Sequence, residues 1–190
     1  VHVPAGPEYP VPKKELPAYL PEFVSGIQHF AADKGLHYDI IHSHYWMSGL
    51  AAEALRQSWK IPFVHMFHTL GLMKNRVARP GEEIEGPARI EGEQKVIQSA
   101  DCLIAATLAE QSQLQFLYGA QKQQIDVIPP GVDTSRFYPI DADEARAVIG
   151  IPPENRMILF VGRIEPLKGV DTLIEAMARM RTHGLLERCP

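Results

Sequence analysis

A chain of 190 residues with 45% hydrophobic content is long enough to bury a core. Its formal net charge of -4 excludes a general attraction to nucleic acid or to an anionic membrane. Cys102 and Cys189 lack metal-ligand spacing, which argues against a disulfide scaffold and a zinc site and predicts a reducing, cytoplasmic compartment. No apolar run reaches the ~18 residues of a membrane span, although peripheral membrane contact through another part of a larger protein stays open.

Helical and strand patterns alternate along the first two thirds of the chain. A proline-rich loop over 8–17 precedes an amphipathic helix over 18–34, and residues 71–87 predict a long loop or a broken helix. Ser48 is the expected N-cap of a helix that ends near Ser58. Strands are predicted over 38–42, 61–67, 102–106 and 125–128, and further helices over 88–100 and 108–118. This alternation predicts an α/β fold with a parallel sheet.

The segment 129–139 contains three prolines and a glycine and predicts a linker between domains. We therefore expect one domain over 1–137 and the start of a second over 138–190. In the second, a helix over 142–149 precedes a buried strand over 157–161, and a further helix begins at 170. Because the chain starts with Val1 and stops one helix after a strand, we expect both ends to continue in a longer protein.

Two cations lie where this last strand gives way to a helix. Arg163 and Lys168 stand five residues apart between Gly162 and Gly169. The carboxyl ends of parallel strands, with helix N-termini pointing toward them, favour anions, and two cations suit a diphosphate. The competing interpretation is that both are solvated loop charges.

Two histidine-containing clusters follow two neighbouring predicted strands. In the first, we expect His42 to point into the core while His44 and Tyr45 face a pocket. The second, His68-Thr69, is expected at the same sheet edge. A metal site is not expected, because no third ligand stands at a suitable spacing.

Basic residues accompany the second cluster and the next helix. Lys74 and Arg76 would give the edge a cation-rich rim suited to sugar hydroxyls and a phosphate. Arg89 stands at a helix start, where a cation is unfavourable unless an anion is close. This misfit predicts phosphate binding, with a surface ion pair to Glu85 as the competing account. Glu91 and Glu93 are interpreted as simple complements of the helix dipole.

Five motifs together resemble the GT-B glycosyltransferases of family 4, in particular the inositol-phosphate N-acetylglucosaminyltransferases of mycothiol synthesis and the sucrose-phosphate synthases. The similarity spans nearly the whole segment, and five motifs in order are far more specific than one. They are His42-Ser-His-Tyr-Trp-Met-Ser-Gly49, His68-Thr-Leu-Gly-Leu-Met-Lys-Asn75, Gly92-Glu-Gln94, Pro130-Gly-Val-Asp133 and Gly162-Arg-Ile-Glu-Pro-Leu-Lys-Gly169.

The resemblance implies two Rossmann-like domains, of which this segment holds most of the N-terminal acceptor domain and the first β-α unit of the donor domain. It implies retaining transfer of a hexosyl group from a nucleoside diphosphate sugar, in this family a UDP-sugar, to a phosphorylated sugar or polyol. No other cofactor and no metal is implied. His68 would lie beside the transferred sugar, and Arg163 with Lys168 would stabilise the leaving diphosphate. The acceptor phosphate would be held by Lys13, Tyr45, Thr69 and Arg89.

The sequence also departs from this family. Its glycine-rich first loop would precede Val1, and the acidic pair of its second domain would follow Pro190. In the His-Thr-Leu loop, Gly-Leu-Met stands where the relative has Ala-Ala-Val, which leaves the acceptor's identity open. Two alternatives remain: a sugar-nucleotide epimerase with the same fold, and a non-catalytic module that binds sugar phosphates.

Overall fold

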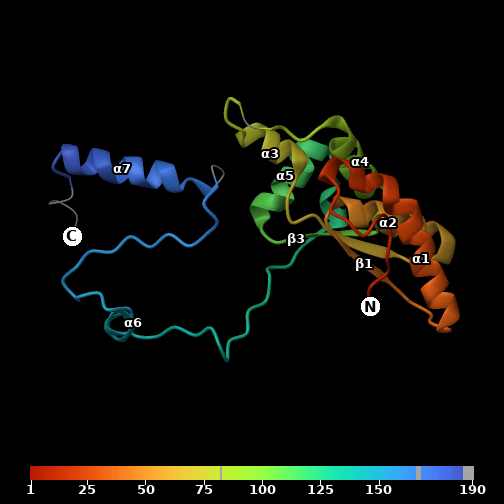
Figure 1. Ribbon diagram of the computed structural model, residues 1–190, viewed down its shortest axis with the longest axis horizontal. Helices are drawn as coiled ribbons and strands as arrows, with labels where there is room; N and C mark the ends of the chain where they lie inside the picture. The colour runs from red at the N-terminus through yellow and green to blue at the C-terminus, as the bar shows by residue number, and fades with distance from the viewer. Residues whose placement is uncertain (82, 166–167, 186–190) are drawn as a thin grey trace. The chain divides into compact units, whose positions relative to one another are not determined.

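The computed structural model describes residues 1–81, 83–165 and 168–185, and the chain divides into two compact units (Figure 1). The first unit is Val1–Pro130 and the second is Gly131–Pro190. The division lies inside the proline-rich segment 129–139.

The first unit is built on a parallel sheet with the strand order β1-β2-β3-β4. Its side chains alternate between a covered face and a more open one, as expected for the two-residue period of a strand. Ser43 of β1 pairs with His65 of β2, which in turn pairs with Leu103 of β3, and all three side chains are buried. The predicted α/β fold with a parallel sheet is therefore confirmed. The strands are β1 Ile41–His44, β2 Phe63–Met66, β3 Cys102–Ala105 and β4 Ile125–Val127.

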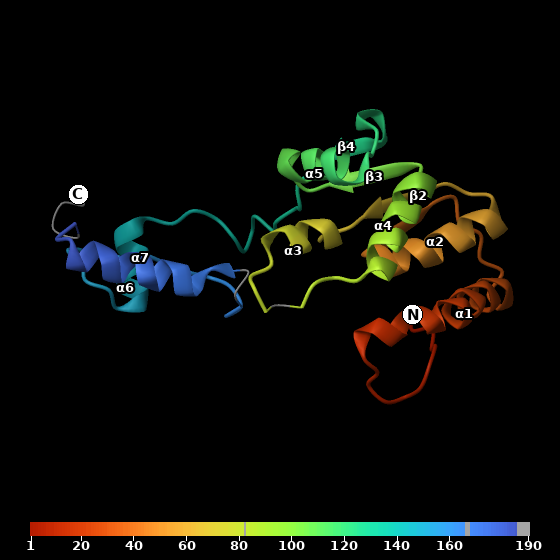
Figure 2. The same cartoon turned by 90° about the horizontal axis from the view of Figure 1, so that it is seen from above.

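Helices connect the strands and cover the sheet. α2 packs against β1 and against α4, which lies beside it (Figure 2), and α5 packs against β3 and β4. The core between sheet and helices is apolar, with Phe63, Val96, Leu103 and Leu114 fully buried. The helical elements are η1 Lys13–Tyr19, α1 Leu20–Asp33, α2 Trp46–Trp59, α3 Gly71–Val77, α4 Pro87–Ser99, α5 Leu108–Tyr118 and η2 Lys122–Gln124.

The ends of α5 follow from its sequence. Thr107 is the N-cap, and its hydroxyl accepts the backbone N–H of Glu110 at 3.1 Å. Gly119 ends the helix in the left-handed region, with φ of 70°. The predicted helix over 108–118 is confirmed to the residue.

The start of α2 differs from the prediction. Ser48 is not the N-cap: the helix already begins at Trp46, and Tyr45 is the cap residue with φ of 70°. The preceding strand is also shifted, because Tyr38 stacks on Trp59 with ring centroids 5.4 Å apart and Ile40 is 55% exposed. The strand therefore occupies Ile41–His44 instead of 38–42, which moves its polar end toward the sheet edge.

The second unit contains two helices among its described residues, α6 Ala142–Ile149 and α7 Val170–Thr182. The predicted strand over 157–161 is wrong. This segment has no strand hydrogen bonds, and Val161 is 85% exposed. A strand is stable only when its backbone pairs with a neighbour, and the described residues of this unit supply no strand for it to pair with.

Candidate functional site

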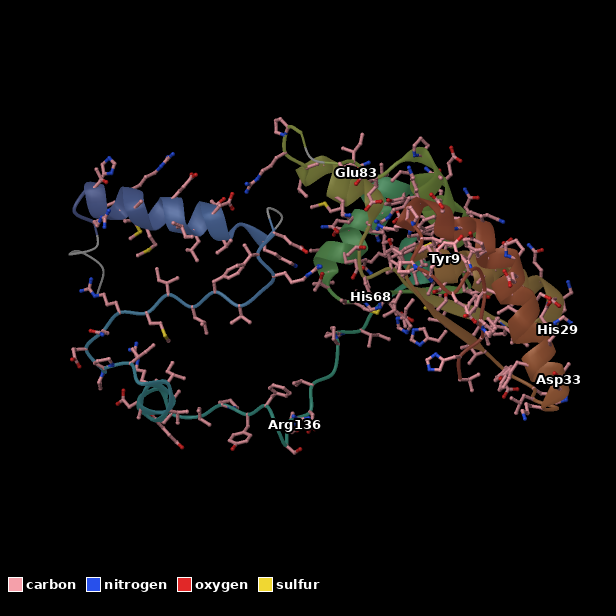
Figure 3. All side chains as sticks on the ribbon, in the orientation of Figure 1. Tyr9, His29, Asp33, His68, Glu83 and Arg136 are labelled. Atoms are coloured by element: carbon pink, nitrogen blue, oxygen red, sulfur yellow. The ribbon has the colours of Figure 1, made fainter. Side chains whose placement is uncertain are left out.

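The ends of β1 and β2 bring two predicted clusters to one edge of the sheet. His44 is paired with Met66, and the backbone N–H of Tyr45 donates to the Met66 carbonyl at 2.9 Å. His68 and Thr69 follow two residues later on β2's side; Figure 3 labels His68. The prediction that the two clusters share an edge is confirmed, because His44 Nδ1 lies 2.9 Å from His68 Nε2.

Both clusters have an unusual backbone. Tyr45 has φ of 70° and His68 has φ of 61°, values that side-chain-bearing residues seldom adopt. Among the described non-glycine residues only Lys60, the left-handed C-cap of α2, shares this property. Such conformations cost on the order of 1–3 kcal/mol and gather at functional sites, where surrounding structure holds them. Here Tyr45 directly follows β1, and His68 lies two residues after the end of β2.

The two edge histidines form a pair of imidazoles. Their rings stack with centroids 5.1 Å apart, and one ring nitrogen must donate to the other. Burial, followed by the neighbouring His42 and His68, lowers the pKa of His44 below its ordinary value. A lowered pKa favours the neutral form of His44, in which one ring nitrogen donates and the other accepts.

His42 does not point into the core, and that prediction is wrong. Its side chain is exposed, while Ser43 occupies the buried position on β1. The buried imidazole belongs instead to His65, whose Nδ1 lies 2.7 Å from the Ser43 hydroxyl. Burial lowers the pKa of His65 to about 3, so this ring is a neutral part of the core.

Arg89, on the first turn of α4, is the buried cation of the site. Its side chain is 4% exposed, and Nη2 donates to the Thr69 carbonyl at 3.1 Å and to the Thr69 hydroxyl at 3.0 Å. Nη1 donates to Glu85 at 2.6 Å, and Nε to Glu93 at 2.8 Å. Burial opposes its charge, but the hydrogen bond and charge of Glu93 outweigh this and raise the pKa of Arg89.

Glu85 lies at the point where three cations meet. Besides Arg89, Lys13 lies 3.3 Å from its Oε1 atom, and Lys74 donates a short hydrogen bond to the same atom. Burial would raise the pKa of Glu85, yet Lys74 and the other cations lower it. Asn75 fixes the backbone of Glu85 through both its N–H, at 2.6 Å, and its carbonyl, at 2.9 Å. The carboxylate of Glu85 thus lies among three cations and serves as their shared anionic partner.

The aromatic ring of Tyr45 joins this group. Lys13 Nζ lies 5.7 Å and Arg89 Cζ 5.3 Å from the ring centroid. The structure therefore brings together Lys13, Tyr45, Thr69 and Arg89, with Lys74 beside them. A pocket of about 510 Å³ opens beside this group; Lys13, Lys74 and Arg89 line it, whereas Tyr45 and Thr69 contact Arg89 and are not among the lining residues. The lining comes from η1 and the residue before it, α2, α3, the segment between α3 and α4, and α4: Pro12, Lys13, Lys14, Pro17, Trp46, Lys74, Glu83, Ile84, Glu85, Gly86, Ala88 and Arg89.

The competing account of Arg89, a surface ion pair with Glu85, is correct in its partner only. The ion pair with Glu85 forms, but the Arg89 side chain is buried and the pair does not lie on the surface. The interpretation of Glu93 as a dipole complement is wrong: its side chain is 0% exposed and bonds Arg89. The i, i+4 spacing of Arg89 and Glu93 on one helix was the available signal, whereas Glu85 precedes the helix and only shares the spacing. Tyr118, which donates to Glu93, had no such signal.

The second unit carries the other two predicted site residues. Arg163 has a 78% exposed side chain and pairs with Glu165 at 2.7 Å. Lys168 is also exposed, and its backbone N–H donates to the Glu165 carbonyl at 2.9 Å. Gly169 follows with φ of 67° and begins α7 as its N-cap. Lys168 therefore lies directly before the N-cap of α7, whereas the strand expected before Arg163 is not formed.

A second hollow, of about 390 Å³, lies where α2 ends and β2 begins. Arg56 pairs there with Asp101 at 2.9 Å, and Asp101 accepts the backbone N–H of Phe63 at 2.9 Å. These contacts attach α2 to the amino end of β2. No predicted site residue lines this hollow, so we assign it a structural role.

Metal-ligand clusters and membrane-spanning helices are both absent from the part of the chain that the structure describes. No three His, Cys, Asp or Glu side chains there are placed to hold a metal ion. No helix in the same residues combines the length and the apolar character needed to cross a bilayer. Cys102 is a free thiol, whereas Cys189 lies outside the described residues.

The fold and the site define a class of protein. A parallel sheet whose strand ends carry polar and basic side chains, joined by a proline-rich segment to a second unit with its own basic helix start, is the plan of GT-B glycosyltransferases. The sequence profile described as Glycosyltransferase Family 4 matches residues 1–136, and that described as Glycosyl transferases group 1 matches residues 141–186. The chain belongs to glycosyltransferase family 4.

Named relatives agree with this assignment. The chain is 44% identical over 181 residues to D-inositol 3-phosphate glycosyltransferase 2 of Catenulispora acidiphila, covering 94% of the chain and 42% of that protein. It is 44% identical over 191 residues to the D-inositol 3-phosphate glycosyltransferase of Actinosynnema mirum, covering 100% of the chain and 44% of that protein. The chain thus spans less than half the length of these curated relatives.

Solved structures share the fold. Sucrose-phosphate synthase from Thermosynechococcus elongatus superposes with a TM-score of 0.79 at 32% identity, over 95% of this chain and 44% of that one. The Anabaena protein HepE, solved with UDP and glucose, superposes with a TM-score of 0.63 at 19% identity, over 83% of this chain and 40% of that one. At that identity HepE supports the fold alone.

Proposed function

We propose that the protein carrying these residues is a retaining glycosyltransferase. It transfers a hexosyl group from a nucleoside diphosphate sugar, in the first instance a UDP-sugar, to a phosphorylated sugar or polyol. Lys13, Tyr45, Thr69 and Arg89 hold the acceptor phosphate. The observation that carries this proposal is the position of Glu85, whose carboxylate is bound by three cations in a pocket of unit one.

The charges of the pocket suit a phosphate monoester. When phosphate displaces Glu85, the cations Lys13, Lys74 and Arg89 face a single remaining carboxylate, that of Glu93, which leaves a formal charge of +2. A phosphate group carries close to two negative charges at pH 7 and offers three acceptor oxygens. Guanidinium and ammonium groups bind such oxygens with charge-assisted hydrogen bonds. The names of the 44% identical relatives support an acceptor of this class.

The proposed reaction transfers the anomeric carbon of the hexosyl group from one oxygen atom to another. The bond between the anomeric carbon of the hexosyl group and the diphosphate oxygen breaks, and its electron pair stays on the diphosphate. An acceptor hydroxyl oxygen forms the new bond to that carbon, and its proton passes to the departing diphosphate. Arg163 and Lys168 stabilise the charge that develops there, which lowers the barrier electrostatically. His68 lies beside the transferred sugar, with His44 as its hydrogen-bond partner.

The parts of the chain divide these tasks. We assign acceptor binding to residues 1–137 and the start of the nucleotide-sugar domain to residues 138–190. The matches of two different profiles, over 1–136 and 141–186, support this division. The free thiol of Cys102 is compatible with a reducing compartment, and we place the protein in the cytoplasm.

The deciding experiment is an acceptor screen with the protein expressed from its complete gene. UDP-glucose and UDP-N-acetylglucosamine are combined with inositol phosphate or fructose 6-phosphate, and with inositol or fructose as matched controls. UDP release and a new glycoside only with a phosphorylated acceptor are expected. Conversion of the nucleotide sugar without an acceptor would favour the epimerase, and phosphate binding without turnover would favour the binding module.

A further inference from the structure

Glu93 is a fully buried carboxylate on α4, with a side chain 0% exposed. A buried charge is costly unless cations and hydrogen-bond donors compensate it. Here Arg89 Nε donates to Oε1 at 2.8 Å, and the Gly71 backbone N–H lies 3.0 Å from Oε1 and 2.9 Å from Oε2. Tyr118 donates a short hydrogen bond to Oε2. Both oxygens of the carboxylate are therefore satisfied.

These donors come from separate elements that meet at the site. Arg89 belongs to α4, Gly71 is the first residue of α3, and Tyr118 is the last residue of α5. Tyr118 also accepts the backbone N–H of Leu72 at 2.9 Å, so α3 is attached to this group twice. The segment that enters α3 is His68-Thr69-Leu70, which carries two proposed site residues.

The close approach of α3 requires a glycine. A Cβ atom at position 71 would lie 2.7 Å from Cδ1 of Ile90, 3.1 Å from Oε2 of Glu93 and 3.2 Å from Nε of Arg89. The space around the carboxylate is thus filled by the groups that bond it. Glu93 does not line the pocket, so its effect on a ligand passes through its neighbours.

We propose that Glu93 is the positioning residue of the acceptor site: it orients the Arg89 guanidinium and fixes the start of α3, so that Arg89 and Thr69 present their polar groups to the acceptor's phosphate. This inference rests on the proposed function. With Nε bound to Glu93, the planar guanidinium can turn only its Nη1 and Nη2 groups toward Glu85 and Thr69. Loss of the hydrogen bond to Glu93 would leave the charge of Arg89 in place but would no longer fix the orientation of its guanidinium group.

Two substitutions separate geometry from charge. Glu93→Asp keeps the charge but withdraws the carboxylate by one methylene, whereas Glu93→Gln keeps the length and one acceptor oxygen for Arg89. Glu91→Asp, at an exposed position of the same helix, is the matched control. The readout is the ratio of affinities of the full chain for inositol phosphate and for inositol, measured by calorimetry.

We expect Glu93→Asp to lower this ratio about tenfold, the size of one charge-assisted hydrogen bond. Glu93→Gln should restore the ratio to within about threefold of the unaltered chain, and Glu91→Asp should leave it unchanged. A purely structural role would weaken both ligands equally, and that result, or an unchanged ratio in Glu93→Asp, would overturn the inference. An unaltered chain with no phosphate preference would instead refute the proposed function itself.

A measurement on the unaltered chain covers the case in which Glu93→Asp does not fold. In ¹⁵N NMR spectra, the Nε proton of Arg89 should exchange with water as slowly as core amides. Added inositol phosphate or inorganic phosphate should shift the Nη signals and leave the Nε signal in place. A rapidly exchanging Nε proton, or one that moves with phosphate, would overturn the positioning role.

Discussion

The two units differ in the exposure of their site arginines and in the strand pairing of their apolar segments. In the first unit Arg89 is 4% exposed and bonded to two carboxylates, whereas Arg163 in the second is 78% exposed and bonded to one. The apolar run of β2 pairs on both sides with neighbouring strands, whereas residues 157–161 pair with none. An apolar run in the sequence favours a strand, but the strand forms only where neighbouring strands are available to pair with it.

The largest expected effect concerns the second unit. In the protein expressed from its complete gene, Arg163→Ala should lower kcat/KM by about 2–4 kcal/mol of transition-state stabilisation, as for the loss of an oxyanion donor. Its free energy of unfolding should change by less than about 0.5 kcal/mol, because the ion pair with Glu165 is exposed. Steady-state kinetics and denaturant melts measure the two quantities, with Arg179→Ala as control. Unchanged turnover would remove Arg163 from the mechanism.

Arg89→Ala, the arginine-to-alanine change in the first unit, should lower the stability of the protein strongly, unlike Arg163→Ala. Arg89→Ala leaves Glu93 buried without its cation, which should cost about 3 kcal/mol of stability. The KM for the phosphorylated acceptor should rise, while hydrolysis of the donor sugar is spared. Lys122→Ala, at an exposed position of η2 outside the site, is the control. Equal losses in acceptor-dependent turnover and donor hydrolysis would contradict the acceptor assignment.

The buried His65 predicts a pH dependence of stability in the first unit. Its folded pKa of about 3 lies below the ordinary value, so its contribution is complete above pH 6.5 and is lost as the pH falls toward 3. Between pH 6.5 and 5 this amounts to about 2 kcal/mol. His65→Asn retains a polar atom for Ser43 and cannot titrate. Denaturant melts at both pH values should show a loss that is larger in the unaltered chain than in this variant by about this amount, because His44 titrates in both; equal losses would be evidence against a neutral His65.

A smaller effect is expected from the close approach of α3. Gly71→Ala places a Cβ 2.7 Å from Ile90, which must move, and should cost about 1–2 kcal/mol of stability. Gly86→Ala, where a Cβ would meet nothing within 4 Å, is the control. Thermal melts compare the two variants. Equal melting temperatures would mean that α3 tolerates a looser contact with Glu93.

The smallest effect tests the internal carboxylate. Glu85→Gln weakens the anion that competes with phosphate, so affinity for inorganic phosphate should rise about fivefold, or about 1 kcal/mol, by calorimetry. Glu91→Gln makes the same charge change at an exposed position of α4 and should have little effect. Weaker phosphate binding by Glu85→Gln would show that Glu85 supports the ligand instead of competing with it.

Local signals predicted much of the first unit. Thr107 and Gly119 mark both ends of α5, and strand ends placed His44 next to His68. Burial was harder to predict, because it depends on contacts between distant residues. Glu93 is buried only because Gly71 and Tyr118 arrive from other elements, and His42 is exposed because the register of β1 puts Ser43 opposite His65.

The account rests on one claim, that Lys13, Tyr45, Thr69 and Arg89 together bind a phosphate. Calorimetry of the full chain with inositol phosphate and with inositol tests it most directly. The account predicts at least about tenfold tighter binding of the phosphorylated ligand, and a preference that shrinks severalfold in Lys13→Ala. Equal affinities for the two ligands, or a preference that Lys13→Ala leaves intact, would contradict it.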